Sequence, residues 1–197
     1  MKFFIKALSL VLCAVMAAFA LVSCGKEAEV VEGEIYADIV IEDYGTITVK
    51  LDADAAPITV TNFVKLAKEG FYDGLTFHRI MEGFMMQGGN GEPAGKKADS
   101  IKGEFSENGV ENNLSHTRGA ISMARTNVMD SASSQFFIVH QDSLFLDGKY
   151  AAFGYVTEGL DVVDEVCESS RPVDNNGTIP TANQPVIKEI VIRDGTK

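Results

Sequence analysis

The sequence has no tryptophan, and it holds only three cysteines and three histidines among 197 residues. Cys13, Cys24 and Cys167 are widely separated, and no cysteine or histidine pair has the spacing of a zinc site. Cys13 and Cys24 both lie in or beside an N-terminal leader, which leaves Cys167 without a partner. The sequence therefore predicts no metal site, no cofactor and no disulfide framework.

Basic residues are also scarce. Seventeen Lys and Arg stand against 28 Asp and Glu, which gives a formal net charge of −11. A surface this acidic repels the phosphates of nucleic acids and of anionic lipids. We therefore expect neither nucleic acid nor an electrostatic membrane contact among the partners.

A long apolar run occurs only at the start of the chain. Lys2 and Lys6, with no acidic residue near them, precede the apolar stretch 7–20, the pattern of a secretory signal peptide. The run ends in Leu-Val-Ser-Cys-Gly at 21–25, which resembles the lipobox of bacterial lipoproteins. The resemblance implies cleavage after residue 23, a diacylglyceryl group on Cys24, and export to the extracytoplasmic face of the bacterial cell membrane. An uncleaved membrane anchor is the alternative, but the run is slightly short for a span of ~20 residues.

The rest of the chain predicts one mainly β domain at 35–197, joined to Cys24 by a charged, flexible spacer over 24–34. Two helices are expected, one from Pro57 to a cap at Gly70 and one over 160–167. Loops at 88–118 and 168–185 are long and poor in strand signals. Alternation of apolar and polar residues, or short apolar runs, predict eight strands at 36–41, 46–51, 75–80, 84–87, 119–124, 135–140, 151–156 and 186–193.

No arrangement of nucleophile, base and acid is recognisable in the sequence. The glycines at 88–91 lack the Lys-Ser/Thr pair that follows a phosphate-binding loop, so they predict a tight turn. What stands out is a set of single polar residues inside apolar strands, namely Arg79, Gln87 and Gln135. A lone arginine in a strand is most often solvent-exposed, and the apolar residues around it most often fill a core.

Several long motifs in register resemble the cyclophilin family. The resemblance covers residues 36–193 and implies a closed eight-stranded antiparallel β-barrel capped by two α-helices. It further implies peptidyl-prolyl cis/trans isomerase activity on proline-containing segments of unfolded or exported proteins, by a chain we expect to be a monomer. The motifs are Phe-His-Arg-Ile at 77–80, Gly-Phe-Met-Met-Gln-Gly-Gly at 83–89, Gly-Ala-Ile-Ser-Met-Ala-Arg-Thr at 119–126, Ser-Gln-Phe-Phe-Ile-Val at 134–139 and Leu-Asp-Gly-Lys-Tyr-Ala-Ala-Phe-Gly at 146–154.

Carried over by position, the resemblance gives each motif residue a role. Arg79 would point at the prolyl nitrogen, with Gln87 binding the substrate carbonyl region and holding Arg79. The catalytic set is then Arg79, Gln87 and Phe84, and the substrate-binding set is Met85, Ala124, Arg125, Gln135, Phe137, Phe145, Leu146 and Tyr150. His78, His116 and His140 are interpreted as structural.

Three positions depart from the usual family pattern. Phe145 stands where many members have tryptophan, and it lacks the indole N–H donor. Tyr150 replaces a frequent histidine, and Arg125 a frequent asparagine. The stretch 95–100 is shorter and more charged than in most relatives, which leaves the preference for residues flanking the proline open.

Isomerisation would need no further chemistry. Rotation about an X–Pro bond meets a barrier of ~18–20 kcal/mol because it breaks amide resonance, and no bond is made or cleaved. Two alternatives remain at this stage. One is a non-catalytic module that binds proline-containing peptides through the same residues, and the other is a lipid-anchored barrel that holds a small ligand inside.

Overall fold

Eight antiparallel strands form one sheet in the computed structural model, which describes residues 34–195. Their spatial order is β3-β4-β6-β5-β7-β2-β1-β8. All eight predicted strands are present: β1 (Ile35–Ile41), β2 (Gly45–Leu51), β3 (Phe77–Met81), β4 (Met85–Gly88), β5 (Ala120–Met123), β6 (Phe136–Val139), β7 (Ala152–Glu158) and β8 (Ile187–Asp194). The predicted signal peptide, Cys24 and the spacer up to residue 33 lie outside the described residues.

The prediction of a closed barrel is wrong, because the sheet is an open half-barrel with β3 and β8 at its two edges. These strands approach each other at the isolated bridge between Thr76 and Val186. Beyond that point the chain leading into β8 occupies the edge of β3 instead. The amide of Ile80 donates to the Gly177 carbonyl at 2.8 Å, and the amide of Ile179 donates to the His78 carbonyl at 3.0 Å. An irregular segment thus takes the hydrogen-bonding positions that a closing strand would need.

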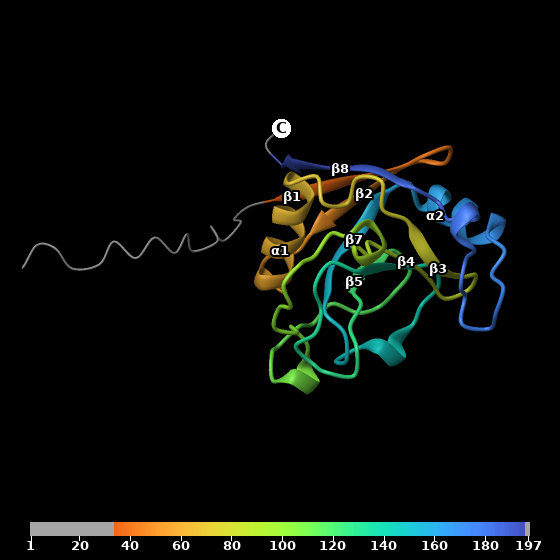
Figure 1. Ribbon diagram of the computed structural model, residues 1–197. Coiled ribbons are helices and arrows are strands. Elements are labelled where there is room, and N and C mark those ends of the chain that lie inside the picture. Colours follow the sequence, from red (N-terminus) through yellow and green to blue (C-terminus); the bar gives the residue numbers. More distant parts are fainter. Residues whose placement is uncertain (1–33, 196–197) are drawn as a thin grey trace, which may run out of the picture.

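Both predicted helices form, α1 (Pro57–Lys68) and α2 (Leu160–Ser169), and they lie on opposite sides of the molecule (Figure 1). Helix α1 starts with Pro57 at its first turn and is followed by Gly70, whose φ of +66° is the left-handed conformation of a helix end. None of the helices among residues 34–195 is both long and apolar enough to cross a membrane.

The N-terminus of α1 is capped from a distant loop. Ala56, at the N-cap position, offers no side-chain acceptor. The buried carboxylate of Glu104 instead accepts the amides of Ile58 at 3.0 Å and Thr59 at 2.7 Å. A carboxylate there satisfies free N–H groups and opposes the positive end of the helix dipole. Because Glu104 is more than forty residues away in sequence, no local pattern predicts this contact.

The interior of the half-barrel is filled by aromatic rings. Phe63 projects from α1 and lies 5.3 Å from Tyr72, 5.5 Å from Phe136 and 5.2 Å from Phe153 between ring centroids. All four side chains are fully buried. Such close packing counts against the alternative in which a small ligand occupies the interior.

Cys167 on α2 is a free, buried thiol whose pKa is raised to about 12 by burial. It is therefore protonated at neutral pH and inert as a nucleophile. In the part of the chain that the structure describes, no group of three or more His, Cys, Asp or Glu side chains could hold a metal ion.

Candidate active site

A cavity of about 140 Å³ opens where β3, β4, the end of β5 and β6 meet the turn at Leu144–Leu146. We call it the prolyl pocket, after the ring that the family resemblance of its motifs would place in it. The structure brings together nine of the residues that the sequence assigned to the site. They are Arg79, Phe84, Met85, Gln87, Ala124, Arg125, Phe137, Leu146 and Tyr150. Gln135 and Phe145, the remaining two, lie beside the pocket.

The position of Arg79 follows from the pairing of β3 with β4. Arg79 stands opposite Gln87 in the register, and a bulge at His78 shifts the alternation just before it. Nη1 of Arg79 donates to Oε1 of Gln87 at 3.3 Å, and Nη2 lies 3.3 Å from the sulfur of Met81. On its other side, Nε donates to the backbone carbonyl of Asn176 at 2.7 Å. The guanidinium is therefore held from two directions at the rim of the pocket.

The charge of Arg79 persists in this setting. Partial burial lowers the pKa of the guanidinium from its usual value, while the nearby Tyr150 and Asp174 act to raise it. A guanidinium starts from a pKa above ~12, so it stays protonated at neutral pH. The pocket thus presents a permanent cation and donor next to an apolar cavity.

The apolar wall of the pocket forms a small cluster separate from the main core. Met85, Phe137 and Leu146 are buried in it, together with Ala120 and Val139. The Phe137 ring lies edge-on to Tyr150 and stacks on the imidazole of His116, with centroids 6.0 Å apart in both pairs. Contacts on both sides fix the ring that forms part of the pocket wall.

His116 lies in a buried hydrogen-bonded chain. Its Nδ1 is 2.8 Å from Oδ1 of Asp147, and its Nε2 is 3.0 Å from Oγ of Ser122. The order serine–histidine–aspartate matches a hydrolase triad, but Ser122 and His116 are both 0% exposed, so no substrate can reach the hydroxyl. These hydrogen bonds hold the imidazole of His116 against the ring of Phe137. His116 thus supports the pocket wall, the structural role expected from the sequence.

Burial makes this support pH-dependent. Burial lowers the pKa of His116, and the hydrogen bond from its Nδ1 to the Asp147 carboxylate opposes the shift without reversing it. A histidine with a lower pKa in the folded state contributes its full stabilisation above its unfolded pKa of ~6.5, and loses it as the pH falls below that value. We therefore expect the free energy of unfolding, measured by urea titration, to fall between pH 7 and pH 5. His116→Asn should flatten that slope without abolishing it, because burial also lowers the pKa of His78. An unchanged slope in the variant would contradict the assignment.

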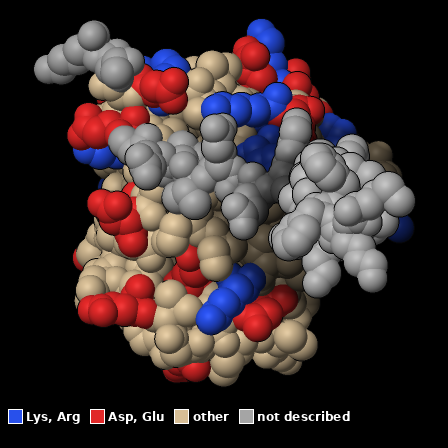
Figure 2. All heavy atoms as spheres, turned by 90° about the vertical axis from the view of Figure 1, so that its left-hand side faces the viewer, with Lys and Arg blue, Asp and Glu red and all other residues tan. Residues whose placement is uncertain are grey.

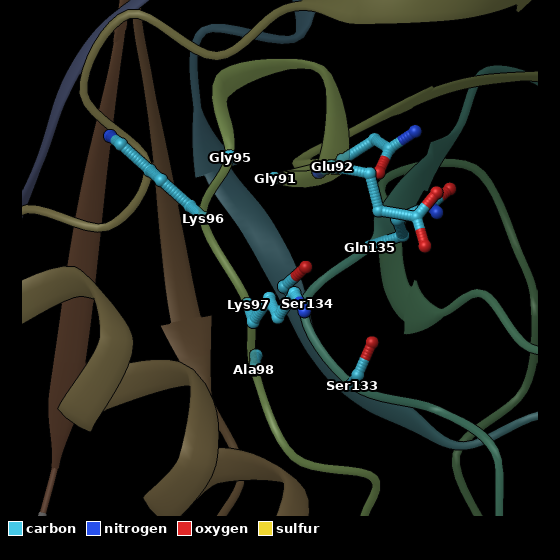
Figure 3. A pocket seen from close by; sticks show the side chains of 10 residues that line it. Gly91, Glu92, Gly95, Lys96, Lys97, Ala98, Ser133, Ser134 and Gln135 are labelled. Atoms are coloured by element: carbon cyan, nitrogen blue, oxygen red, sulfur yellow. The ribbon is translucent and has the colours of Figure 1, made fainter.

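Figure 3 shows a second cavity, of about 460 Å³. It is lined by Asn90, Gly91, Glu92, Gly95, Lys96, Lys97, Ala98, Ser133, Ser134 and Gln135. Gln135 connects the two cavities, because its Oε1 accepts a hydrogen bond at 2.9 Å from Nε2 of Gln87. The charged stretch that the sequence placed beside the groove, 95–100, thus supplies four residues of this wall.

The two lysines of that wall differ in what they can do. Figure 3 shows Lys96 turned away from the cavity, and its Nζ donates to the carbonyls of Phe71 at 2.8 Å and Asp73 at 2.9 Å. Lys96 therefore ties this loop to the segment after α1. Lys97 is exposed and remains available to solvent or to a ligand.

Arg125 is held by the protein backbone. Its Nε and Nη2 donate to the carbonyl of Lys149 at 2.9 and 2.8 Å, and its guanidinium lies over the rings of Phe105 and Tyr150. Most of its donors are thus satisfied within the protein. Phe145 is 63% exposed, and its ring lies 5.6 Å from that of Phe84, so it extends the apolar surface beyond the pocket.

Sequence reasoning missed three contributors to the site. Met81 contacts Arg79 through its sulfur, Asn176 accepts the Nε–H of Arg79, and Asp174 lies close enough to raise the pKa of Arg79. Alternation along β3 could have indicated Met81, since it lies two residues from Arg79. No sequence signal marks a backbone carbonyl such as that of Asn176.

Comparison with known proteins identifies the family. Residues 36–194 match the model of the cyclophilin type peptidyl-prolyl cis-trans isomerase/CLD family. Peptidyl-prolyl cis-trans isomerase A of Dickeya dadantii is 44% identical over 154 residues, which cover 76% of this chain and 77% of the relative. Peptidyl-prolyl cis-trans isomerase B of Bacillus subtilis is 47% identical over 123 residues, which cover 61% of this chain and 82% of the relative.

Comparison with solved structures also points to the cyclophilin family. The cyclophilin type isomerase of Cryptosporidium parvum superposes with a TM-score of 0.71 at 26% identity, covering 83% of this chain and 99% of that protein. A second structure of that protein was determined in the presence of the dipeptide Ala-Pro, with a TM-score of 0.69 at 26% identity, covering 81% of this chain and 99% of that one. The chain therefore belongs to the cyclophilin family and is a peptidyl-prolyl cis-trans isomerase.

Proposed function

We propose that the prolyl pocket holds the ring of a substrate proline while Arg79 assists rotation about the preceding amide bond. The observation that carries the proposal is the guanidinium of Arg79, fixed by Gln87 and Asn176 at the rim of an apolar cavity. A cavity of about 140 Å³ has room for a five-membered ring.

The geometry suits a reaction that forms no covalent intermediate. In the twisted amide the prolyl nitrogen becomes pyramidal and regains a lone pair, which a fixed N–H donor can bond. In the planar amide that lone pair is delocalised, so the contact favours the transition state over either ground state. Met85, Phe137 and Leu146 exclude water from one side of the pocket, which strengthens the contact with Arg79.

The test is a prolyl isomerisation assay on the purified full-length chain, with exchange of an Ala-Pro peptide followed by NMR and peptide binding measured in parallel. Exchange accelerated in proportion to enzyme concentration supports the proposal. Peptide binding by a folded chain without accelerated exchange would contradict it, and would favour the non-catalytic binding module.

We further propose that the substrates are proline-containing segments of unfolded or exported proteins. The second cavity adjoins the prolyl pocket through Gln135 and has room for residues that flank a bound proline. Acidic side chains spread over the face in Figure 2, and the net charge of −11 gives the surface no affinity for anionic lipid. Attachment to a membrane would therefore need either a covalent lipid or an uncleaved N-terminal anchor.

Cys24 is the proposed site of that lipid. We expect cells grown with labelled fatty acid to incorporate label into the wild-type chain and not into Cys24→Ala, because the thiol is the atom that lipoprotein processing modifies. Cys167→Ala is the matched control, since that thiol is buried and should not change labelling. Equal labelling of wild type and Cys24→Ala would contradict the proposal.

A further inference from the structure

The segment 171–179, which we call the strap, runs along the free edge of β3 beside Arg79. Two backbone hydrogen bonds pin it there, from Ile80 to the Gly177 carbonyl at 2.8 Å and from Ile179 to the His78 carbonyl at 3.0 Å. The next carbonyl toward the N-terminus, that of Asn176, accepts the Nε–H of Arg79 at 2.7 Å. This is the shortest hydrogen bond that the guanidinium makes with the described residues.

The other contacts of the guanidinium are weaker. The hydrogen bond to Gln87 is 3.3 Å long, and two more contacts are made to the sulfur atoms of Met81 and Met85 at 3.3 and 3.9 Å. Thioether sulfur is a poor acceptor. The plane of the guanidinium therefore depends mainly on the direction of the Asn176 carbonyl.

The side chain of Asp174 helps to fix that direction, together with the Asp174 backbone carbonyl, which accepts the amide of Gly177 at 3.2 Å. Its Oδ1 accepts the amides of Asn176 at 2.9 Å and Thr178 at 3.0 Å, the two N–H groups on either side of the Asn176–Gly177 peptide. The strap is closed further by the amide of Val173, which donates to the Thr178 carbonyl at 2.9 Å. Backbone hydrogen bonds keep the pKa of Asp174 below its usual value, so the side chain is an ionised acceptor at neutral pH.

The strap has little freedom to find another path. Gly177 has a φ of +86°, and a Cβ there would lie 2.5 Å from Cγ of Met81 and 2.7 Å from the carbonyl oxygen of Ile80. Only glycine accommodates both the left-handed backbone and this close approach to β3. A strap that lost the two hydrogen bonds to Asp174 Oδ1 would remain pinned at Gly177. Its Asn176–Gly177 peptide would keep only the longer bond from the Gly177 amide to the Asp174 carbonyl, so it could rotate.

We propose that Asp174 is a positioning residue for isomerisation, which holds the Asn176 carbonyl in the direction that orients the guanidinium of Arg79. This rests on the proposed function, in which Arg79 contacts the prolyl nitrogen. Asp174 is itself exposed, and it acts through the strap. Its loss should affect the transition state, where the direction of the N–H donor matters, more than ground-state peptide binding.

The experiment compares Asp174→Ala with Asp174→Asn in the full-length chain. We expect Asp174→Ala to lower kcat roughly tenfold with KM within about twofold of wild type, because a misdirected donor weakens transition-state bonding. Asp174→Asn keeps an acceptor oxygen in the same place and should recover most of the lost activity. In an Arg79→Ala background Asp174→Ala should have no further effect. The NMR resonance of Arg79 Nε–H should shift in Asp174→Ala and not in Asp174→Asn.

Asp130 provides a matched control. It is also an exposed loop aspartate whose Oδ1 accepts a backbone amide, that of Gly103 at 3.0 Å, but its loop packs on 103–108. Asp130→Ala should leave kcat unchanged. Wild-type kcat in a folded Asp174→Ala, with Arg79→Ala inactive, would overturn the role of Asp174 alone. Near-normal turnover in Arg79→Ala would overturn the proposed function and this inference together.

Discussion

Arg79→Ala is expected to lower kcat/KM for prolyl isomerisation by about 10²–10³-fold, the usual loss when one fixed transition-state donor is removed. The side chain is half-buried at the edge strand β3, and its hydrogen-bond partners are the Gln87 side chain and the Asn176 carbonyl. Both partners can turn to solvent when the guanidinium is absent. We therefore expect the thermal midpoint and the affinity for a proline peptide to stay close to wild type. Exchange spectroscopy and peptide titration on the same samples measure both quantities.

Two further variants separate charge from geometry. Arg79→Lys keeps a cation but loses the planar fork, and it should recover only a small part of the activity. Arg193→Ala removes an arginine of β8 that pairs with Asp38, and it should leave turnover unchanged. Turnover close to wild type in a folded Arg79→Ala would show that rotation in this pocket does not depend on the guanidinium.

Much of the site could be predicted from the sequence because its residues fall in motifs that resemble the cyclophilin family, and some of these motifs form regular strands. Arg79 and Gln87 come from neighbouring strands joined by a short turn, so their pairing follows from local register. Nine of the assigned residues line one cavity, four from strands and five from the turns and loops that adjoin them. Phe145 shows the limit of that reasoning, because a turn residue next to the buried Leu146 is largely exposed.

What the sequence could not predict depends on contacts between distant segments. Glu104 caps a helix more than forty residues away, and the Asn176 carbonyl reaches Arg79 across 97 positions. The open sheet has the same origin. Alternation predicts eight strands equally well for a closed or an open arrangement, and the strap along β3 decides between them. Backbone groups carry these contacts, and every residue has them, so no residue type marks their positions.

Phe63→Ala is expected to lower the free energy of unfolding by about 3–5 kcal/mol, the range found for phenylalanine truncated in a packed core. The ring of Phe63 is 0% exposed and has three aromatic neighbours, Tyr72, Phe136 and Phe153, within 5.5 Å between centroids. Those neighbours come from the segment after α1, from β6 and from β7, so they cannot collapse together into the space left behind. Urea unfolding of the two proteins at one pH measures the difference. A loss of this size is a large share of the ~5–15 kcal/mol that stabilises a typical domain.

Ile58→Ala on the same helix is the control, because its side chain is 43% exposed and should cost less than about 1 kcal/mol when truncated. If both variants lost the same small amount of unfolding free energy, α1 would not be held by the aromatic cluster.

The Phe63→Ala variant also tests how far the core and the active site depend on each other. Phe136 and Phe137 are consecutive on β6 and face opposite sides of the sheet, the first toward Phe63 and the second into the prolyl pocket. A cavity at Phe63 should therefore lower stability well before it lowers kcat, since the pocket wall has its own support from His116 and Tyr150.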